Sequence, residues 1–292
     1  MAKVICSANM KGGVGKTTLS VNLAFELFRR GNRVLLVDND PQFNATSALL
    51  SPKRYIDDCL SDTNQCTIYH VYEKPPRVHG TKRPKVGQKQ FTMSLWHLAR
   101  KDNITLDLLP SQIELYETLK NPSQKEYLLQ RFLAQYAAQY EYIFIDCPPT
   151  PSVLTLAAFA ASDYVLIPVT PDYFATLGLP QFLGTLEDFK ENVVLDSHKI
   201  VPLGVIFTNV PRSETDDTVK AMTRVSDALA DLPFEVPVFR AKMTHCKVYE
   251  KSLWQSVPVQ QIRGRGVRGK SIASADLSAI AEELMDKINE KS

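Results

Sequence analysis

The chain has 292 residues, of which 34 are basic and 32 acidic, and its net charge of +2 favours no class of partner by itself. A hydrophobic content of 44% and a charged content of 23% are those of an ordinary soluble globular protein, with enough chain for one large α/β domain or two small ones. Five cysteines, an odd number without C-x-x-C spacing, suggest neither a disulfide framework nor a zinc site and favour a reduced, cytoplasmic protein. We expect neither secretion nor membrane spanning, because no leader is present and Ser162-Asp163 interrupts the most apolar stretch, 153–169.

Short apolar runs alternate with helical patterns along the chain. The runs predicted as strands cover 4–7, 33–37, 105–109, 142–145, 164–169 and 201–208. The segments predicted as helices cover 17–30, 126–140, 155–161, 179–191 and 218–230, and a final apolar stripe comprises Leu277, Ile280, Ala281, Leu284 and Ile288. Continuously apolar strands separated by helices predict an α/β fold with a doubly wound, mostly parallel sheet and helices on both faces. We expect a single domain over 1–292, with the final stripe docked on the sheet.

The stretch 74–101 departs from this alternation. It holds eight basic residues and no acid, together with three prolines and two glycines. Its first half is predicted to be a mobile surface loop. Such a basic insertion is either a solvated surface or a contact for nucleic acid or another partner, and the sequence leaves both open.

A phosphate-binding loop is predicted between the first strand and the first helix, in the run Met10-Lys11-Gly12-Gly13-Val14-Gly15-Lys16-Thr17-Thr18. Glycines let backbone N–H groups turn toward phosphates, a lysine binds the β- and γ-oxygens, and a hydroxyl binds Mg²⁺. Gly13, Gly15, Lys16 and Thr17 supply these groups. The usual G-x-x-x-x-G-K-[ST] spacing fails here, because Met10 stands at the first glycine position.

The run Lys11-Gly12-Gly13-x-Gly15-Lys16-Thr17 instead resembles the deviant Walker A motif of the ParA/MinD family. The resemblance implies a SIMIBI-type P-loop NTPase that binds ATP and Mg²⁺ and forms a dimer with two nucleotides between its subunits. It implies that residues 12–18 (Gly12, Gly13, Val14, Gly15, Lys16, Thr17 and Thr18) hold the phosphates. It also implies that the extra lysine, Lys11, reaches the partner subunit's nucleotide and takes part in hydrolysis.

Two acids end the second predicted strand, in Asp38-Asn39-Asp40-Pro41-Gln42. Sites in open α/β sheets form at the carboxyl edge, and hydrolysis there needs one group to orient water and others to support the metal. The run resembles the family's V-D-x-D-P-Q segment, which implies that Asp40 handles the attacking water while Asp38 supports Mg²⁺. The alternative is a strand-ending turn whose acids are merely solvated.

A buried strand that ends in Asp146 is predicted over Tyr142-Ile143-Phe144-Ile145-Asp146-Cys147-Pro148-Pro149. A Walker B segment has this form, because Mg²⁺ keeps water ligands that a nearby carboxylate accepts from. The run resembles the family's I-D-x-P-P, and Thr17, Asp38 and Asp146 are therefore the candidate metal residues. The segment 168–178 resembles one that lies at the family's dimer interface.

Asn209 follows the strand predicted over 201–208, where the family recognises adenine. Its amide edge suits the adenine N6 and N7 positions. The alternative is that Asn209 only caps a turn before Pro211.

The segment 240–270 concentrates positive charge, with eight basic residues against the single acid Glu250. Spaced cations that neutralise phosphates bind DNA without reading its sequence. Many ParA-type ATPases bind DNA through this part of the chain, and the alternative is a solvated surface. The candidate DNA-binding residues are Lys242, Lys247, Lys251, Arg263, Arg265, Arg268 and Lys270. The run 264–271 satisfies the ordinary phosphate-loop pattern, but a proline interrupts the preceding run, so we expect no second nucleotide site there.

These features predict a ParA-like ATPase with slow, partner-stimulated hydrolysis. The resemblance implies an ATP-bound homodimer that binds nonspecific DNA of the nucleoid, with a ParB-like or other cargo adaptor that stimulates hydrolysis and releases the dimer. The cargo, a plasmid, a chromosome origin or a protein assembly, stays open.

A MinD-like, membrane-associated regulator of cell division is the main alternative. Its C-terminal amphipathic helix would need a basic polar face, whereas residues 276–292 hold five acids and two lysines. An electron-transfer or metal-delivery member of the superfamily would need paired cysteines, and no C-x-x-C exists.

Overall fold

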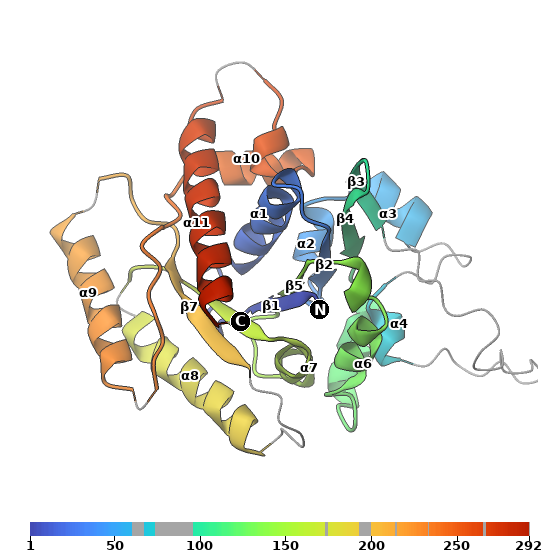
Figure 1. Cartoon of the computed structure of the whole chain (residues 1–292), viewed down its shortest axis with the longest axis horizontal. Coiled ribbons are helices and arrows are strands. Elements are labelled where there is room, and N and C mark those ends of the chain that lie inside the picture. The colour runs from blue at the N-terminus through green and yellow to red at the C-terminus, as the bar shows by residue number, and fades with distance from the viewer. Residues whose placement is uncertain are drawn as a thin grey trace, which may run out of the picture.

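A single seven-stranded sheet organises the computed structural model, which describes residues 1–59, 67–73, 96–172, 175–192, 200–213, 215–232, 234–264 and 267–291 (Figure 1). The strand order is β3-β4-β2-β5-β1-β6-β7. Every neighbouring pair is parallel except β3 and β4. The strands are β1 (Lys3–Ser7), β2 (Val34–Asp38), β3 (Trp96–Lys101), β4 (Ile104–Leu109), β5 (Tyr142–Asp146), β6 (Tyr164–Val169) and β7 (Val201–Phe207).

The central strands are apolar along their whole length because both faces of the sheet are covered. Successive side chains of a strand point to opposite faces. Ile5 and Phe144 therefore belong to one buried cluster, and their neighbours Cys6 and Ile145 belong to the other. All four side chains are completely buried. The doubly wound, mostly parallel α/β fold predicted from the sequence is confirmed.

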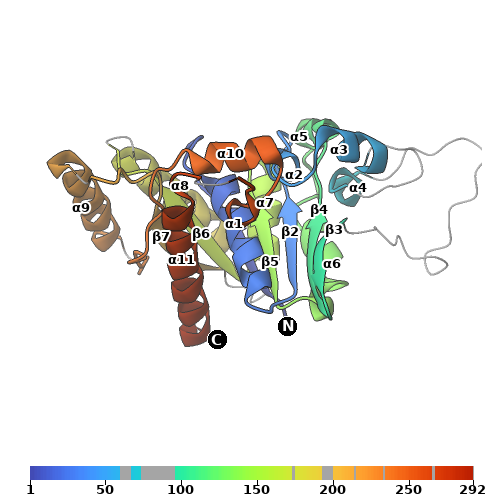
Figure 2. The same cartoon turned by 90° about the horizontal axis from the view of Figure 1, so that it is seen from above.

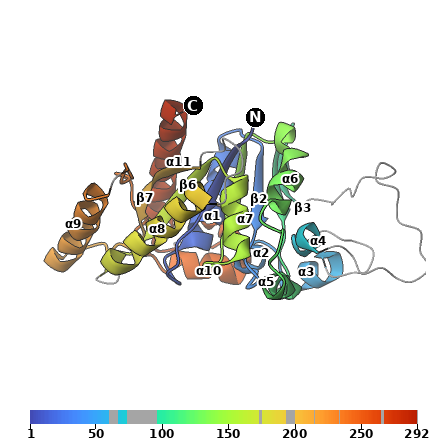
Figure 3. The same cartoon turned by 90° about the horizontal axis from the view of Figure 1, so that it is seen from below.

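Helices form the two outer layers. The α-helices are α1 (Lys16–Arg29), α2 (Asn44–Ser47), α3 (Pro52–Cys59), α4 (Tyr69–Tyr72), α5 (Tyr116–Lys120), α6 (Leu128–Ala134), α7 (Val153–Ala161), α8 (Ala175–Asn192), α9 (Asp216–Ala230), α10 (Val248–Gln255) and α11 (Lys270–Lys291). Three short 3₁₀ helices are η1 (Ile113–Leu115), η2 (Ala137–Gln139) and η3 (Val259–Gln261). Helices α1, α10 and α11 cover one face (Figure 2), and α6, α7 and α8 cover the other (Figure 3).

The basic insertion and the helix predicted over 126–140 differ from the structure. The residues 96–101, assigned to the basic insertion, form strand β3, while 74–95 lie outside the described residues. An edge strand pairs on one side only, so it lacks the continuous apolar run that marks a central strand. The helix predicted over 126–140 is divided into α6 and η2, because the chain must turn back before Tyr142, which pairs with both Lys3 and Val34.

Helix α11 docks through its apolar stripe, as predicted. Leu277, Ile280, Ala281, Leu284 and Ile288 are all completely buried, and the helix contacts α1 and β7. None of the helices in the described part of the chain combines the length and the apolar character needed to cross a membrane.

The outer edge of β7 is covered by the segment 236–239. The Val205 N–H donates to the Pro237 carbonyl at 2.8 Å, and the Phe239 N–H donates to the Val205 carbonyl at 2.8 Å. Gly204 makes this close approach possible: its φ is +149°, and a Cβ there would lie 2.6 Å from the Pro237 oxygen. The chain then continues into the basic segment 240–270, so the fold joins β7 rigidly to that surface.

Candidate functional site

The loop between β1 and α1 lies at the carboxyl edge of the sheet and has the backbone of a phosphate cradle. Gly13 and Gly15 have φ values of +75° and +82°, which favour glycine. A Cβ on Gly12 or Gly13 would meet no heavy atom within 4 Å, so the concave side of the loop is open. The loop leads directly into α1, whose first N–H groups have no helical acceptor and suit an anion.

Lys16, the first residue of α1, directly follows this loop. Its side chain is buried, and its ammonium donates to the Lys11 carbonyl at 3.0 Å. Burial lowers the pKa of Lys16, against the opposing effect of nearby Asp146. A buried ammonium held by one backbone carbonyl is suited to exchange that contact for phosphate oxygens.

Asp146, at the end of β5, receives hydrogen bonds from the first turns of α1. Thr17 Oγ1 donates to Asp146 Oδ2 at 2.7 Å, and Ser20 Oγ donates to Oδ1 at 3.3 Å. Burial raises the pKa of Asp146 to about 7, while Thr17 and Lys16 act in the opposite direction. The threonine and aspartate that the sequence assigns to the metal are therefore in direct contact. Ser20 was not predicted.

Asp38 and Asp40 occupy different surroundings. Asp38 is fully buried, and its Oδ2 accepts from the backbone N–H and the hydroxyl of Thr46, both at 2.7 Å. Burial and the nearby Asp146 charge raise the pKa of Asp38 to about 8. Asp40 is 5% exposed, and its Oδ1 accepts from the Gln42 N–H at 2.9 Å. Burial raises the pKa of Asp40, although the nearby Lys16 charge lowers it.

Asn39, between the two acids, is fixed by a buried network that the sequence did not reveal. Its amide nitrogen donates to the Leu154 carbonyl at 2.8 Å, and its oxygen accepts from the Tyr72 hydroxyl at 2.9 Å. Tyr72 belongs to the short helix α4 and is 3% exposed. The network therefore ties the acidic turn both to α4 and to the beginning of α7.

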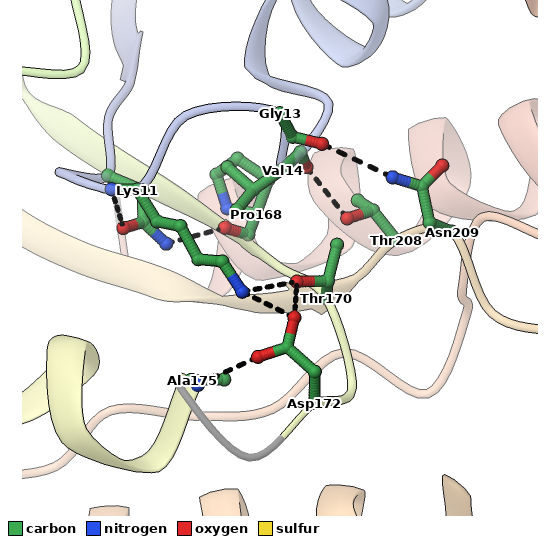
Figure 4. Close-up of polar contacts among 10 residues, drawn as sticks. Lys11, Gly13, Val14, Pro168, Thr170, Asp172, Ala175, Thr208 and Asn209 are labelled. Atoms are coloured by element: carbon green, nitrogen blue, oxygen red, sulfur yellow. Dashed lines mark hydrogen bonds and ion pairs between the residues drawn. The ribbon is translucent and has the colours of Figure 1, made fainter.

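Lys11 turns away from the cradle and pairs within its own chain (Figure 4). Its ammonium contacts the Asp172 carboxylate, and it lies 3.4 Å from Thr170 Oγ1. Asp172 also accepts from Thr170 Oγ1 at 2.6 Å and from the Ala175 N–H at 3.0 Å, at the start of α8. Burial raises the pKa of Asp172, but the hydrogen bonds from Lys11 and Thr170 outweigh it, so the pKa lies below its ordinary value.

The end of β7 supports the loop from the opposite side. Thr208 Oγ1 donates to the Val14 carbonyl at 2.7 Å, and the Asn209 amide donates to the Gly13 carbonyl at 3.3 Å (Figure 4). Met243 fills the space beside Gly15, where a Cβ would lie 3.1 Å from its methyl group. Asn209 has a φ of +53° and sits next to the loop. Both sequence interpretations of Asn209, adenine contact and turn residue, remain compatible with this position.

The candidate DNA-binding residues spread over four parts of the chain between β7 and α11. Lys242 lies half-buried in the segment after 236–239, the exposed Lys247 is the N-cap of α10, and the exposed Lys251 lies on α10. Arg263 and Arg268 are both exposed. Arg265 lies outside the described residues. Lys270, the first residue of α11, donates to the Ile262 carbonyl at 2.8 Å. The residues before Gly264 form η3 rather than a sheet strand, unlike the context of the loop at 10–18.

Comparison with known proteins agrees with this geometry. The sequence model of a family described as an AAA domain matches residues 2–199. The sporulation initiation inhibitor protein Soj of Bacillus subtilis is 38% identical over 196 residues, which cover 67% of this chain and 69% of Soj. The chain belongs to the ParA/MinD family of P-loop ATPases.

Two solved structures resemble this ParA/MinD-family chain. Cobyrinic acid a,c-diamide synthase from Mycobacterium smegmatis, with a bound ATP analogue and magnesium, is 28% identical, with a TM-score of 0.68 over 98% of this chain and 94% of that one. The pNOB8 ParA structure, bound to nonspecific DNA, is 23% identical, with a TM-score of 0.69 and full coverage of both chains. At that identity the second likeness shows the fold alone.

Proposed function

We propose that the protein is an ATPase that closes into a dimer around two ATP·Mg²⁺, binds DNA without sequence preference, and positions a cargo on the nucleoid. Partner-stimulated hydrolysis then opens the dimer. The observation that carries this proposal is the contact of Thr17 with Asp146 beside a buried Lys16 and an open glycine loop. The donor set fits a magnesium nucleotide, because a hydroxyl, a carboxylate and a lysine are the groups that hold it in P-loop enzymes.

Each residue of the loop has a distinct part in this mechanism. The N–H groups of residues 12–18 and the Lys16 ammonium would bind the phosphates. Thr17 and Asp146 would hold the metal, with Asp38 fixed behind Asp146 by its Thr46 bonds as support. Bound Mg²⁺ would neutralise charge on the β- and γ-phosphate oxygens.

Asp40 is our candidate for the residue that orients the attacking water. It is nearly buried at the same edge, and one of its oxygens is used by the Gln42 N–H. Burial raises its pKa, while the Gln42 N–H and the nearby Lys16 charge act in the opposite direction. Asn209 would contact adenine next to the loop.

Lys11 would act on the nucleotide of the other subunit. It already lies at the edge of the loop and points away from its own cradle, toward Asp172 (Figure 4). Its departure from Asp172 is then part of dimer closure. The same step would create the DNA-binding form, with cations of both subunits on one surface, and an adaptor of the ParB type would return it to the open form.

The MinD-like alternative is disfavoured by α11. A membrane-bound amphipathic helix needs a free apolar face, and the apolar stripe of α11 is already buried against the sheet and α1.

The experiment that tests the proposal compares three variants by light scattering coupled to size exclusion, with and without ATP. Asp40→Ala is expected to accumulate ATP-bound dimer and to lose roughly 10²–10⁴ in hydrolysis rate, because the water is no longer oriented. Lys16→Ala is expected to lose ATP binding, and Lys11→Ala to bind ATP but remain monomeric. A Lys11→Ala protein that dimerises and hydrolyses normally would refute the role in the partner's site.

A further inference from the structure

Helix α10 carries a tryptophan that the fold does not use. Trp254 is 90% exposed, and its neighbour Leu253 is 47% exposed. The helix is anchored instead by Val248, Tyr249 and Ser252, which are buried on the opposite face. A large aromatic side chain left in water contributes nothing to the core, and such residues are enriched at contacts with other molecules.

The indole shares a face of α10 with two lysines. Lys247, the N-cap of α10, is spaced i, i+4 and i+7 with Lys251 and Trp254, so the three residues share one stripe. The acid on this face is Glu250, one turn before the tryptophan. Among the described residues, neither lysine forms an ion pair with a carboxylate.

A second segment brings a third cation to the same place. The Arg263 N–H donates to Gln255 Oε1 at 3.2 Å, which holds this exposed arginine at the end of α10. The Lys251 ammonium lies 3.7 Å from the position that a Cβ on Gly264 would take. Lys251 on the same helix and Arg263 on the neighbouring loop therefore both lie near the carboxyl end of α10, which carries Trp254.

The surface is held rigidly, which lowers the entropy cost of binding. Ser256, after α10, donates to the Ser47 carbonyl of α2 at 3.3 Å, and the Val259 N–H donates to the buried Asn22 of α1 at 2.9 Å. Both α10 and α2 lie at the carboxyl end of β2 (Figure 2). The face is thus fixed to the helix that follows the phosphate loop.

We propose that Trp254 is a DNA-contact residue, with its indole packed on the deoxyribose backbone between phosphates bound by Lys251 and Arg263. The inference rests on the proposed DNA binding and adds an uncharged contact to it. The charge complementarity of the surrounding cations selects a polyanion over an apolar partner. Apolar side chains that pack on sugars or into a groove add affinity without adding to the salt dependence.

Fluorescence provides a direct test, because the chain has two tryptophans, Trp96 and Trp254. In the full-length Trp96→Phe protein, Trp254 is the sole indole. With a nonhydrolysable ATP analogue present, addition of a random-sequence duplex is expected to change its emission in parallel with binding measured by gel shift.

Measurements of DNA affinity at several salt concentrations distinguish the contribution of the indole from that of the cations. Trp254→Ala is expected to weaken DNA binding roughly five- to tenfold with an unchanged salt slope. Lys251→Ala is expected to reduce the slope by about 0.9, the value for one phosphate contact. The matched control is Ile56→Ala on α3, an apolar side chain that is 59% exposed and outside the cationic face; it is expected to leave binding unchanged.

The contrary outcomes are distinct. An emission change with the ATP analogue alone would place Trp254 in the contact between subunits. An emission change only with vesicles that contain phosphatidylglycerol would place Trp254 at a membrane. Both outcomes overturn the inference. Wild-type affinity of Trp254→Ala for DNA would overturn it while leaving the proposed function intact. Failure of the unmodified protein to bind DNA would overturn both.

Discussion

At the scale of single residues, Lys11 must break its ion pair with Asp172 before it can reach the nucleotide of another subunit, and this costs free energy. The two side chains are 36% and 39% exposed, so the pair is worth about 1 kcal/mol or less. Asp172→Asn keeps the acceptor for the Ala175 N–H but removes the charge. We expect ATP-dependent dimers to form at up to about fivefold lower protein concentration, measured by analytical ultracentrifugation.

Glu187→Gln is the control for this prediction, because it removes another lysine–carboxylate ion pair, with Lys190, within helix α8, which begins shortly after Asp172. It is expected to leave the dimer midpoint unchanged. Equal midpoints for Asp172→Asn and the unmodified protein would show that Lys11 is not restrained by Asp172.

Tyr72 also acts at the residue scale, through its hydroxyl bond to Asn39. Tyr72→Phe leaves a buried amide oxygen without its donor, and the free energy of unfolding is expected to fall by about 1–3 kcal/mol in urea titrations. Tyr69→Phe on the same short helix is the control, since its ring is partly exposed. Equal stabilities of the two variants would argue against a structural role for the network.

Contacts of this kind could not be predicted from the sequence. The phosphate loop, Asp40 and Asp146 follow local patterns, because loop, strand and helix are adjacent in the chain. Asp172 and Tyr72 meet Lys11 and Asn39 across long separations, and only the folded sheet brings them together. Asp172 lies in the segment 168–178 that resembles the family's dimer interface, but no sequence pattern pairs it with Lys11, and none marks Tyr72.

At the scale of elements, the parallel strands could be predicted because burial on both faces makes them apolar throughout. The edge strand β3 could not, because its composition reflects an exposed edge, and its pairing with β4 contains an irregularity between His97 and Ala99. Helix α8 begins at Ala175, earlier than predicted, although Pro180 lies inside it. Local composition favours a later start there, and tertiary packing extends the helix.

The close approach of β7 to the segment 236–239 gives an element-scale prediction. Gly204→Ala puts a Cβ against the Pro237 carbonyl at 2.6 Å and the Phe239 ring at 2.9 Å, in a backbone conformation that favours glycine. The free energy of unfolding is expected to fall by about 1–3 kcal/mol, measured by urea denaturation.

Gly184→Ala provides the contrast. Gly184 lies exposed inside α8, with no atom within 4 Å of an added Cβ, and alanine there is expected to stabilise the protein by about 0.5–1 kcal/mol. Loss of stability in both variants would mean that Gly204 is no more constrained than an ordinary helix position.

At the scale of the whole molecule, Asp38 and Asp146 make stability depend on pH. They are register partners on β2 and β5, both completely buried, and burial raises their pKa values to about 8 and about 7 from an ordinary 3.8. The fold therefore favours their neutral forms. This contribution is complete below about pH 4 and is lost as pH rises through 7 and 8.

Without nucleotide and metal, the free energy of unfolding should thus decline between about pH 4 and pH 8 and level off above, with a slope of at most about 1.4 kcal/mol per pH unit for each carboxyl. Urea titrations of the unmodified protein and of Asp38→Asn measure this. The variant carries no charge at this position and should gain in stability relative to the unmodified protein as pH rises. Parallel pH profiles would contradict the prediction.

The glycines of the phosphate loop have a consequence for how such a sequence can diverge. Gly15 is required by the fold itself, because its φ is +82° and Met243 occupies the space beside it. Gly12 has no such restriction: its φ is not in the positive region, and no protein atom lies within 4 Å of an added Cβ. Only a bound ligand would exclude a side chain there. A descendant that lost its nucleotide would therefore be free to replace Gly12 while keeping Gly15.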